Sequence, residues 1–352
     1  MTRKAARPAS PNPLENENTA PMKSWIFEQF NVSADENPAA FDPANYQAEL
    51  TWRRKSWADA EALGYEGIFF SEHHFGGARV SPAPALVAAA AAAVTKRLRI
   101  GVLGWVLPLS QPWRVLEEIG VLDHLSGGRL EVGLARGSGP DEAAALGVDQ
   151  EHLQPMFDEA RHIIRKAMDT VPLEHAGTYW TLKNLHIVPS PLQRPFPPVW
   201  ATVRSARAAQ EAAREGHKVC TGFLSVDEVC ALFDEYRNAI HAGSEDEVSS
   251  RLAIRRCIFV APGRAEALEQ ADTARHRIPS ILEQDTIAGS PADVVEQIVE
   301  QARRTGAGHM VGFFTGNTLD RNALLTSYRL YGLQVIPALG RHFGQQQTSL
   351  AL

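Results

Sequence analysis

The sequence predicts an α/β fold, a (β/α)8 or TIM barrel with an insertion between the fourth and fifth units. Eight short apolar runs alternate along the chain with segments whose apolar residues recur at helical spacing. The runs are apolar at successive positions, which is typical of parallel strands buried on both faces. With 352 residues, the chain has the length of one barrel domain that carries an extension.

Each predicted strand is followed by a predicted helix. We expect strands at residues 24–31, 66–70, 97–107, 129–135, 198–203, 217–223, 252–261 and 309–314. We expect helices at residues 45–63, 83–94, 113–125, 152–170, 205–215, 226–242, 263–275, 291–304 and 320–332. Residues 171–198 are rich in proline and lack helical spacing, so we expect the insertion to contain short strands there.

Two doubly wound domains are the alternative to a barrel, and they would need a dinucleotide-binding fingerprint. The stretch GSGPDE at 137–142 lacks the third glycine of that fingerprint. It also does not follow the first predicted strand. The single barrel is therefore the favoured fold.

Composition excludes several classes of protein. Residues 1–22 are rich in Pro, Asn and Ala, and predict a disordered tail ahead of a barrel domain at 23–352. A net charge of -6 gives no general basic field for nucleic acid. No apolar run is long enough to span a membrane, and the tail lacks the apolar core of a signal peptide. The three cysteines have neither metal nor redox spacing, so we expect reduced thiols and a cytoplasmic protein.

Polar side chains follow the predicted strands at the end where a barrel carries its active site. The carboxyl ends of all eight strands surround one mouth, and active sites are built there. We therefore expect one site that is formed by Glu72, His73 and His74 after the second strand, Leu103 and Gly104 in the third, Ala135 and Arg136 after the fourth, and Thr202, Arg204 and Ser205 after the fifth.

The adjacent His73 and His74 allow three interpretations: a metal site, a base, or hydrogen-bonded structural groups. Metal ligands on a strand usually stand two residues apart, because such side chains share a face. Adjacent residues point to opposite faces, and no second ligand cluster follows at a later strand end. We therefore expect no metal here, while a purely structural role for both histidines stays open.

A phosphate site is the second hypothesis for the mouth. Ser205 precedes a predicted helix and can cap it. An anion at that helix start would meet free backbone N–H groups and the positive helix end. Arg136 and Arg204 offer planar guanidinium groups that match phosphate oxygens. The alternative, a simple cap with both arginines paired to nearby acids, also stays open.

Several stretches resemble the bacterial luciferase-like flavin monooxygenase superfamily. They are EALGYEGIFFSEHHF (61–75), the segment from SPAPALV to GLARG (81–137), PFPPVWATVRS (195–205), GSPADVVEQI (289–298) and YGLQVIPAL (331–339). Together they extend over nearly all of the chain after about residue 23, and DHLSGGRLEVGLARG is the most specific of them. EHHF is more similar to the luciferase and alkanal-oxidising branch than to the deazaflavin-dependent branch.

The resemblance implies a (β/α)8 barrel and an FMNH2-dependent monooxygenase. Reduced FMN would be supplied by a separate flavin reductase. It would react with oxygen to give a C4a-hydroperoxyflavin that oxygenates an aldehyde or similar small organic substrate, while the protein orients and shields the cofactor. The resemblance also implies a homodimer, with helices 83–94 and 113–125 as candidate contacts. It further implies a lid near 261–290 that excludes water from the site.

The resemblance also implies roles for single residues. His73 matches the first histidine of the family's motif and would be the catalytic base or steer the peroxide, which suits an imidazole. Arg136 and Ser205 match residues that hold the flavin phosphate. Arg204 stands where luciferases carry an acid, and a further phosphate contact is expected of it.

The remaining cofactor-binding residues would surround the flavin ring system. Leu103 and Gly104 match a non-proline cis peptide beneath the isoalloxazine. Ala135 matches a position that is a reactive cysteine in luciferases, so that thiol is absent here. Glu72 would hold His73 in position without contacting the substrate. Thr202 is the last of the expected cofactor-binding residues.

Three other functions remain as alternatives. An F420 (deazaflavin)-dependent oxidoreductase on the same barrel would transfer hydride, and a flavin-binding homologue would lack catalysis. A metal hydrolase is disfavoured by the ligand spacing. The substrate is not set by the sequence, because Phe75, Trp105, Phe313 and Phe314 can line a pocket at the mouth or belong to the core.

Overall fold

A computed structural model of the chain describes residues 22–32, 37–137, 139–240, 243–278, 281–314 and 321–350, with the backbone alone given for 345–350. Residues 1–21, where the disordered tail is predicted, lie outside the described residues. Met22, the last residue of that predicted tail, is buried in the core. The statements below concern the described residues.

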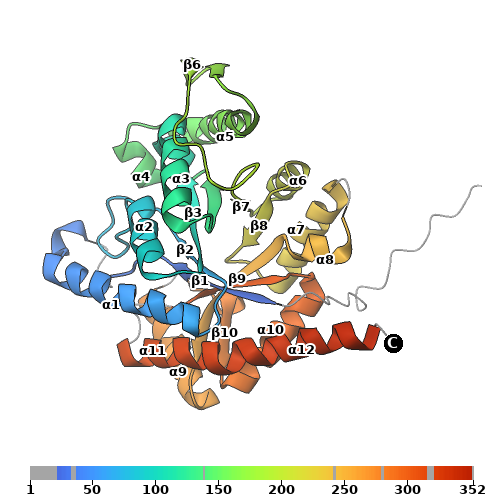
Figure 1. The fold of residues 1–352 in the computed structure, drawn as a ribbon. Helices are drawn as coiled ribbons and strands as arrows, with labels where there is room; N and C mark the ends of the chain where they lie inside the picture. Colours follow the sequence, from blue (N-terminus) through green and yellow to red (C-terminus); the bar gives the residue numbers. More distant parts are fainter. Residues whose placement is uncertain are drawn as a thin grey trace, which may run out of the picture.

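Eight parallel strands close into a barrel, as the sequence predicts (Figure 1). Their order around the barrel is β1-β2-β3-β4-β7-β8-β9-β11, and β9 closes it by pairing with both β8 and β11. The strands are β1 Lys23–Glu28, β2 Gly67–Phe70, β3 Arg99–Val106, β4 Leu130–Ala135, β7 Val199–Thr202, β8 Lys218–Thr221, β9 Leu252–Val260 and β11 His309–Phe313.

Helices surround the barrel because each strand is followed by a segment with an apolar face. The helices of the ring are α1 Pro43–Ala62, α2 Pro84–Val94, α3 Pro112–Ser126, α5 Leu153–Asp169, α6 Ala206–Arg214, α7 Val226–Ala239, α9 Arg264–Arg277, α10 Pro291–Thr305 and α11 Arg321–Leu330. Four of these, α1, α2, α3 and α10, carry proline in the first turn, where the missing N–H has no intrahelical partner to lose. The short α4 (Pro140–Ala145) does so too.

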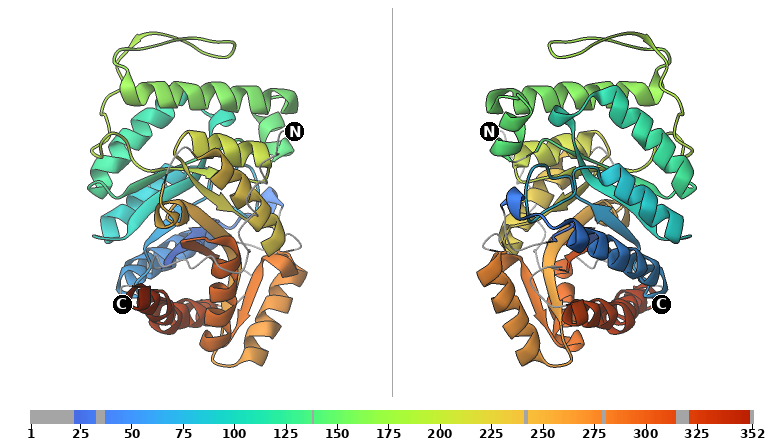
Figure 2. Two further views of the ribbon diagram at one scale, coloured as in Figure 1. Left: turned by 90° about the vertical axis from the view of Figure 1, so that its right-hand side faces the viewer. Right: turned by 90° about the vertical axis from the view of Figure 1, so that its left-hand side faces the viewer.

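The predicted insertion lies between β4 and β7. It contains α4, α5 and an antiparallel hairpin formed by β5 Leu173–Ala176 and β6 Thr181–Leu185. The short strands expected in this proline-rich region are therefore confirmed. Figure 2 shows the hairpin at the outer margin of the molecule, on the far side of α5 from the barrel.

One predicted helix end near the C-terminus needs correction. The closing helix does not stop near 332 but continues through a π turn, Tyr331–Val335, into α12, Ile336–Leu350. Gly332 and Pro337 suggest an end, yet Gly332 lets the chain pass Leu63, since a Cβ there would lie 2.6 Å from the Leu63 Cβ. Pro337 lies just after the π turn, where the regular i→i−4 hydrogen bonding of the helix is already interrupted.

The predicted lid segment, 261–290, is mainly regular structure in its described part. After α9, a short β10 (Thr286–Gly289) pairs in parallel with β9 and adds a ninth strand outside the closed barrel. A 3₁₀ turn, Glu283–Asp285, leads into it. This turn places Asp285 against β9, and that contact matters for the site described below.

Aromatic rings fill the barrel interior near the N-terminal ends of the strands. Trp25 stacks on Phe69 with ring centroids 4.7 Å apart, and Trp200 meets Phe69 edge-on at 5.1 Å. Gly67 and Gly101 make room for these rings, because a Cβ on either would lie within 2.4 Å of a Trp25 or Phe69 ring atom. The interior is thus a packed core, and the opposite end is left for a site.

A neutral histidine belongs to this ring layer. His309 Nδ1 accepts a hydrogen bond from Trp25 Nε1 at 2.9 Å, and His309 Nε2 lies 2.8 Å from the Ser250 carbonyl. One ring nitrogen therefore accepts and the other donates, which is the pattern of an uncharged imidazole. Burial lowers the pKa of His309 to about 3, with a smaller contribution from the charge on Lys218.

The first prediction is that His309 makes folding stability depend on pH. The unfolded chain takes up a proton near the ordinary value of 6.5, whereas the folded chain does so only near 3. Stability from this group is therefore complete above pH 6.5 and is lost as the pH falls toward 3. At pH 5 the loss is about 2 kcal/mol at most. Denaturant unfolding at pH 7 and pH 5 should give a smaller difference for His309→Gln than for wild type, and equal differences would contradict this assignment.

Candidate active site at the barrel mouth

The loop after β2 carries the two histidines. β2 ends at Phe70, so residues 71–75 lie beyond the strand. This differs from the expectation that the two histidines alternate as they would on a strand. His73 donates its backbone N–H to the Ser81 carbonyl at 3.2 Å. The alternation of a strand therefore does not apply to this pair, and each histidine is positioned by its own carboxylate.

Glu72 connects this loop to the end of β3. Its carboxylate accepts the Val106 N–H at 3.1 Å through one oxygen, and the other oxygen lies 3.0 Å from His74 Nε2. The hydrogen bond with Glu72 raises the pKa of His74, against the opposing effect of burial. Glu72 thus contacts His74 and the backbone of β3, and so holds the loop in place. Among the described residues it makes no hydrogen bond to His73.

Glu142 is a site residue that the sequence analysis missed. It comes from α4, and its Oε1 lies 3.4 Å from His73 Nδ1 and accepts the His74 N–H at 3.2 Å. Burial alone would raise the pKa of Glu142, but the hydrogen bonds with His73 and His74 outweigh it and hold that pKa below its ordinary value. A carboxylate in the first turn of a helix right after the fourth strand was the available signal.

The third strand carries the expected cis peptide. The bond between Leu103 and Gly104 is cis, as the resemblance implies. Gly104 lies on the backbone of Gly133 in β4, where a Cβ would be 2.8 Å from the Gly133 carbonyl. Leu103 is buried in the inner core of the barrel. The glycine is therefore required by close packing between neighbouring strands as well as by any ligand above it.

The ends of β4 and β7 form a cationic corner. The two strands are paired, with Leu134 opposite Ala201, so the residues that follow them are neighbours at the mouth. Ala135 is half-buried, and Arg136 and Thr202 are exposed. Arg136 has no ion-pair partner among the described residues, so the alternative that an acid neutralises it finds no support there.

Ser205 caps α6, as predicted. Its Oγ accepts the Ala208 N–H at 3.3 Å, and its carbonyl accepts the Ala209 N–H at 3.1 Å. Neither Ala206 nor Arg207 finds an acceptor for its backbone N–H within the described chain. Exposed Arg204 lies beside this helix start. The corner therefore combines guanidinium groups with free N–H donors at a helix N-terminus, which is a donor set for an anion.

Four charged or aromatic residues were also missed, which lie in the loop after β8, on β9 and in the turn before β10. Arg255 Nη2 lies 2.5 Å from one oxygen of Asp285, and Arg256 Nη1 lies 3.2 Å from the other. Phe223 donates its N–H to the same carboxylate at 3.1 Å. Burial lowers the pKa of Arg256, against the effect of Asp285. The signal was two arginines inside an otherwise apolar strand, LAIRRCIFV, because buried charges need partners.

The four aromatic residues with open roles are now placed. Phe313 is buried in the barrel interior, 6.3 Å from the Phe27 ring. Phe314 packs in the outer core against Tyr65, and Trp105 is likewise buried in the outer core, with its Nε1 directed to a carboxylate of α3. Phe75 is 58% exposed. Only Phe313 therefore contributes to the inside of the barrel, and Phe75 lies on the surface of the loop that carries the histidines.

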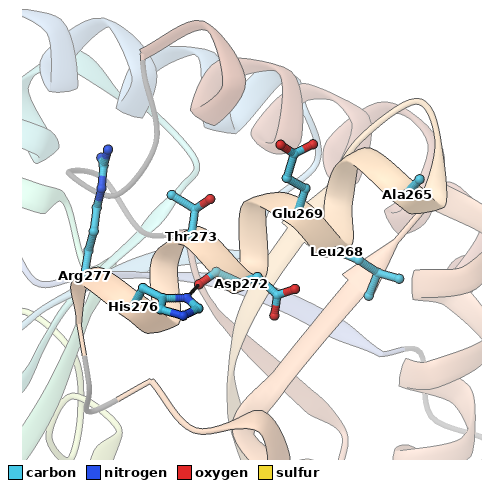
Figure 3. A pocket seen from close by; sticks show the side chains of 7 residues that line it. All are labelled: Ala265, Leu268, Glu269, Asp272, Thr273, His276 and Arg277. Carbon is cyan, nitrogen blue, oxygen red and sulfur yellow. Dashed lines mark hydrogen bonds between the residues drawn. The ribbon is translucent and has the colours of Figure 1, made fainter.

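An open depression of about 570 Å³ lies elsewhere, along α9. Figure 3 shows that its lining residues are Ala265, Leu268, Glu269, Asp272, Thr273, His276 and Arg277, all from this one helix. The depression is formed by side chains along one side of α9, and none of these side chains is fully buried. We therefore place the candidate active site at the mouth, where charged groups from several strand ends converge.

Sequence comparison decides the family. The profile of the luciferase-like monooxygenase family matches residues 22–281. The chain belongs to this family. An uncharacterized family relative from Sinorhizobium fredii, y4wF, is 35% identical over 239 residues, which are 67% of this chain and 69% of the relative. The oxygenase component of a flavin-dependent trigonelline monooxygenase from Acinetobacter baylyi is 28% identical over 59% of this chain and 58% of its own length.

Solved structures of low sequence identity share the fold. Monooxygenase RslO1 from Streptomyces bottropensis is 22% identical, with a TM-score of 0.80 over 90% of this chain and 99% of its own. The oxygenating constituent of 3,6-diketocamphane monooxygenase from Pseudomonas putida, in complex with FMN, is 20% identical with a TM-score of 0.77, over 90% and 98% of the two chains. The coenzyme F420-dependent tetrahydromethanopterin reductase from Methanopyrus kandleri is 17% identical with a TM-score of 0.67, over 91% and 100%.

Two further findings concern the chain as a whole. None of the described helices is long and apolar enough to span a membrane. All three cysteines are free thiols. Cys220 and Cys257 are buried, and burial raises the pKa of each to about 12.

The second prediction is that Asp285 stabilises the fold strongly. Asp285→Asn would leave two buried guanidinium groups, Arg255 and Arg256, without a neutralising charge. The expected loss is about 3–5 kcal/mol in the free energy of unfolding. Asp272→Asn is the matched control, because Asp272 pairs with Arg275 on the exposed side of α9. Its expected effect is within about 0.5 kcal/mol. Denaturant unfolding measures both, and similar losses for the two variants would refute the role of Asp285.

Proposed function

We propose that this protein is an FMNH2-dependent monooxygenase that oxygenates a small organic molecule, an aldehyde or similar compound. The observation that carries the proposal is the meeting of three features at one barrel mouth. These are the carboxylate-paired His73, the cis peptide at Leu103, and the cationic corner around Arg136. Membership of the luciferase-like family supports the same reading.

The donor set at the mouth fits the phosphate of FMN. A phosphate needs several strong donors that are not already used by the protein. Arg136 and Arg204 supply guanidinium groups without an ion-pair partner in the described structure. Ser205 adds a hydroxyl, and the first turn of α6 adds the N–H groups of Ala206 and Arg207. We assign these residues to the phosphate, with Thr202 beside them at the end of β7.

The ring system of the flavin would lie against the ends of β3 and β4. The Leu103–Gly104 peptide and half-buried Ala135 offer backbone and small side chains, which permit close approach. Glu72 holds the histidine loop against β3 through the Val106 N–H and so fixes the width of this part of the mouth. When bound, reduced FMN supplies the electrons that activate molecular oxygen, and one oxygen atom is transferred to the substrate.

His73 is the group that would hold or move a proton. Glu142 lies on its Nδ1 side and favours the tautomer with the proton at Nδ1, which leaves the Nε2 lone pair free as a base. Its imidazole is one-fifth exposed, so it is reachable from the mouth. Glu142 is thereby a positioning residue that fixes the orientation of the ring.

The proposal extends to partners. The trigonelline relative is named as an oxygenase component, which supports a separate reductase as the source of reduced FMN for this chain. Oxygen and the organic substrate are the other reactants. We also propose a homodimer, because α2 and α3 together expose Leu86, Val121 and Leu125. We further propose that the protein is located in the cytoplasm. An F420-dependent oxidoreductase remains the alternative, supported by a shared fold alone.

The third prediction concerns cofactor binding. Anaerobic titration with reduced FMN should show that Arg136→Gln binds about 10-fold to 100-fold more weakly than wild type, because one charge-assisted hydrogen bond is lost. Arg97→Gln is the control, since Arg97 precedes β3 at the opposite end of the barrel and is highly exposed. Binding of a reduced deazaflavin, without binding of reduced FMN, would transfer the assignment to the F420 alternative.

The fourth prediction separates chemistry from binding. His73→Ala should bind reduced FMN within about threefold of wild type, because the histidine lies apart from the phosphate corner. After mixing with oxygen, its rate of productive substrate oxygenation should fall by about 100-fold or more, the usual contribution of a positioned acid or base. Glu142→Gln should retain part of that rate, since the imidazole remains. An unchanged rate in His73→Ala would remove His73 from the mechanism.

A further inference from the structure

Two arginines share a single carboxylate near the floor of the mouth. Arg255 and Arg256 are 4% and 0% exposed, and Asp285, which pairs with both, is also 0% exposed. Taking charges out of water costs several kcal/mol for each ion, and pairing must offset that cost. A structural ion pair would be neutral, but this group retains an excess positive charge. No other acid among the described residues pairs with either guanidinium.

Arg255 is the member of this group whose guanidinium faces the barrel interior. Its guanidinium carbon lies 4.0 Å from the centre of the Phe223 ring, 5.8 Å from that of Phe313 and 5.9 Å from that of Phe27. Rings at these distances attract a cation without neutralising it. Arg256, the next residue, instead contacts Gln301 on the helix side of β9. Arg255 is therefore the charge that faces the inside of the barrel.

The backbone around Arg255 is shaped to hold it. Phe223 has a left-handed φ of 64°, which is unfavourable for a phenylalanine and places its ring over the guanidinium. Gly222 has no side chain where a Cβ would lie 2.4 Å from Arg255 Nε. That Nε is buried and has no hydrogen-bond partner. Uncommon backbone geometry of this kind concentrates at sites that bind ligands.

The position of β9 places this charge opposite the proposed flavin platform. Around the barrel, β9 is separated from β3 by three strands on each side. Arg255 in β9 thus lies across the interior from Leu103 and Gly104 in β3. Leu103 and the rings of Phe27 and Phe313 belong to one buried cluster between them. A substrate held above a flavin on β3 would lie on the β9 side of the mouth, within reach of this cluster.

A second cation stands above the first. The Arg204 guanidinium lies 5.8 Å from the centre of the Phe223 ring, so two guanidinium groups lie near one aromatic side chain. Arg204 is exposed at the rim, whereas 5% of the Arg255 side-chain surface remains accessible. An anion that enters the mouth would therefore meet positive charge first at the rim and then at the floor.

We propose that the substrate of this enzyme carries a carboxylate or comparable oxyanion, and that Arg255 is the specificity-determining residue that binds it. Phe223 forms the adjoining wall, and Asp285 orients the guanidinium through Nη2. The bound anion balances the excess charge of the Arg255, Arg256 and Asp285 group. This inference rests on the proposed monooxygenase function, in which the flavin phosphate occupies the corner formed by Arg136, Arg204 and the start of α6.

The test uses matched pairs of acids and isosteric neutral amides. Calorimetric titration would compare benzoate with benzamide, hexanoate with hexanamide, and cyclohexanecarboxylate with cyclohexanecarboxamide, each in the presence of anaerobic reduced FMN and again without flavin. Wild type should bind the acid of at least one pair about 10-fold or more tightly than its amide, the effect of one charge-assisted hydrogen bond. Arg255→Met should abolish this preference, and Arg255→Lys should restore part of it.

Three controls make the result specific. Arg255→Met keeps Asp285 paired with Arg256, and its unfolding midpoint checks that the fold is intact. Arg136→Gln should keep the preference for acids, because it changes only the phosphate corner. Arg264→Met, at an exposed arginine on α9, should change nothing. A preference for acids that survives in Arg255→Met would show that the acid does not bind at Arg255. A preference that disappears in Arg136→Gln would show that the acid binds at the phosphate corner, and either result would overturn the inference.

The outcomes also separate this inference from the proposed function. If reduced FMN binds but no acid is preferred over its amide, the inference is wrong and the monooxygenase proposal stands. If acids are preferred through Arg255 but reduced FMN does not bind, the anion site is supported and the cofactor assignment fails. If neither binds, both proposals fail.

Discussion

The packing of aromatic rings inside the barrel is the constraint on which the rest of the structure depends. Trp25, Phe69 and Trp200, with the neutral His309 bonded to Trp25, occupy the interior near the N-terminal ends of the strands. This layer fills the barrel interior and closes the barrel at the N-terminal ends of the strands. Ligand chemistry is thereby confined to the carboxyl ends of the strands, where loops are free to vary.

At the mouth, three buried or half-buried carboxylates convert those loops into a defined site. Glu72 joins the histidine loop to β3, Glu142 joins the insertion to the same loop, and Asp285 joins the turn before β10 to β8 and β9. Each carboxylate accepts a backbone N–H and also contacts a cationic or titratable side chain. The His73 imidazole, which is the proposed base, and the buried Arg255 are therefore positioned by the same kind of contact, although they lie on different sides of the barrel.

Most of the fold could be predicted because its signals are local. Continuous apolar runs located the eight strands, and Ser205 was identified as a cap from its place before a helix. The partners of charged residues could not be predicted in this way. Glu142 lies 69 positions from His73 along the chain, and Asp285 lies 30 positions from Arg255. Such pairs are set by how strands close around the barrel. The sequence pointed to His73 in the first pair and to neither residue of the second.

The aromatic rings of Phe27, Phe223 and Phe313 around Arg255 have an electrostatic consequence. Aromatic side chains offer little solvation to a charge, so the field of the buried cation is weakly screened from below and from the sides. Its field lines leave chiefly through the open mouth, past Arg204 at the rim. If Arg255 binds an anion as proposed, this opening would attract small anions although the chain as a whole carries a net charge of -6, and their rate of capture would fall as ionic strength rises.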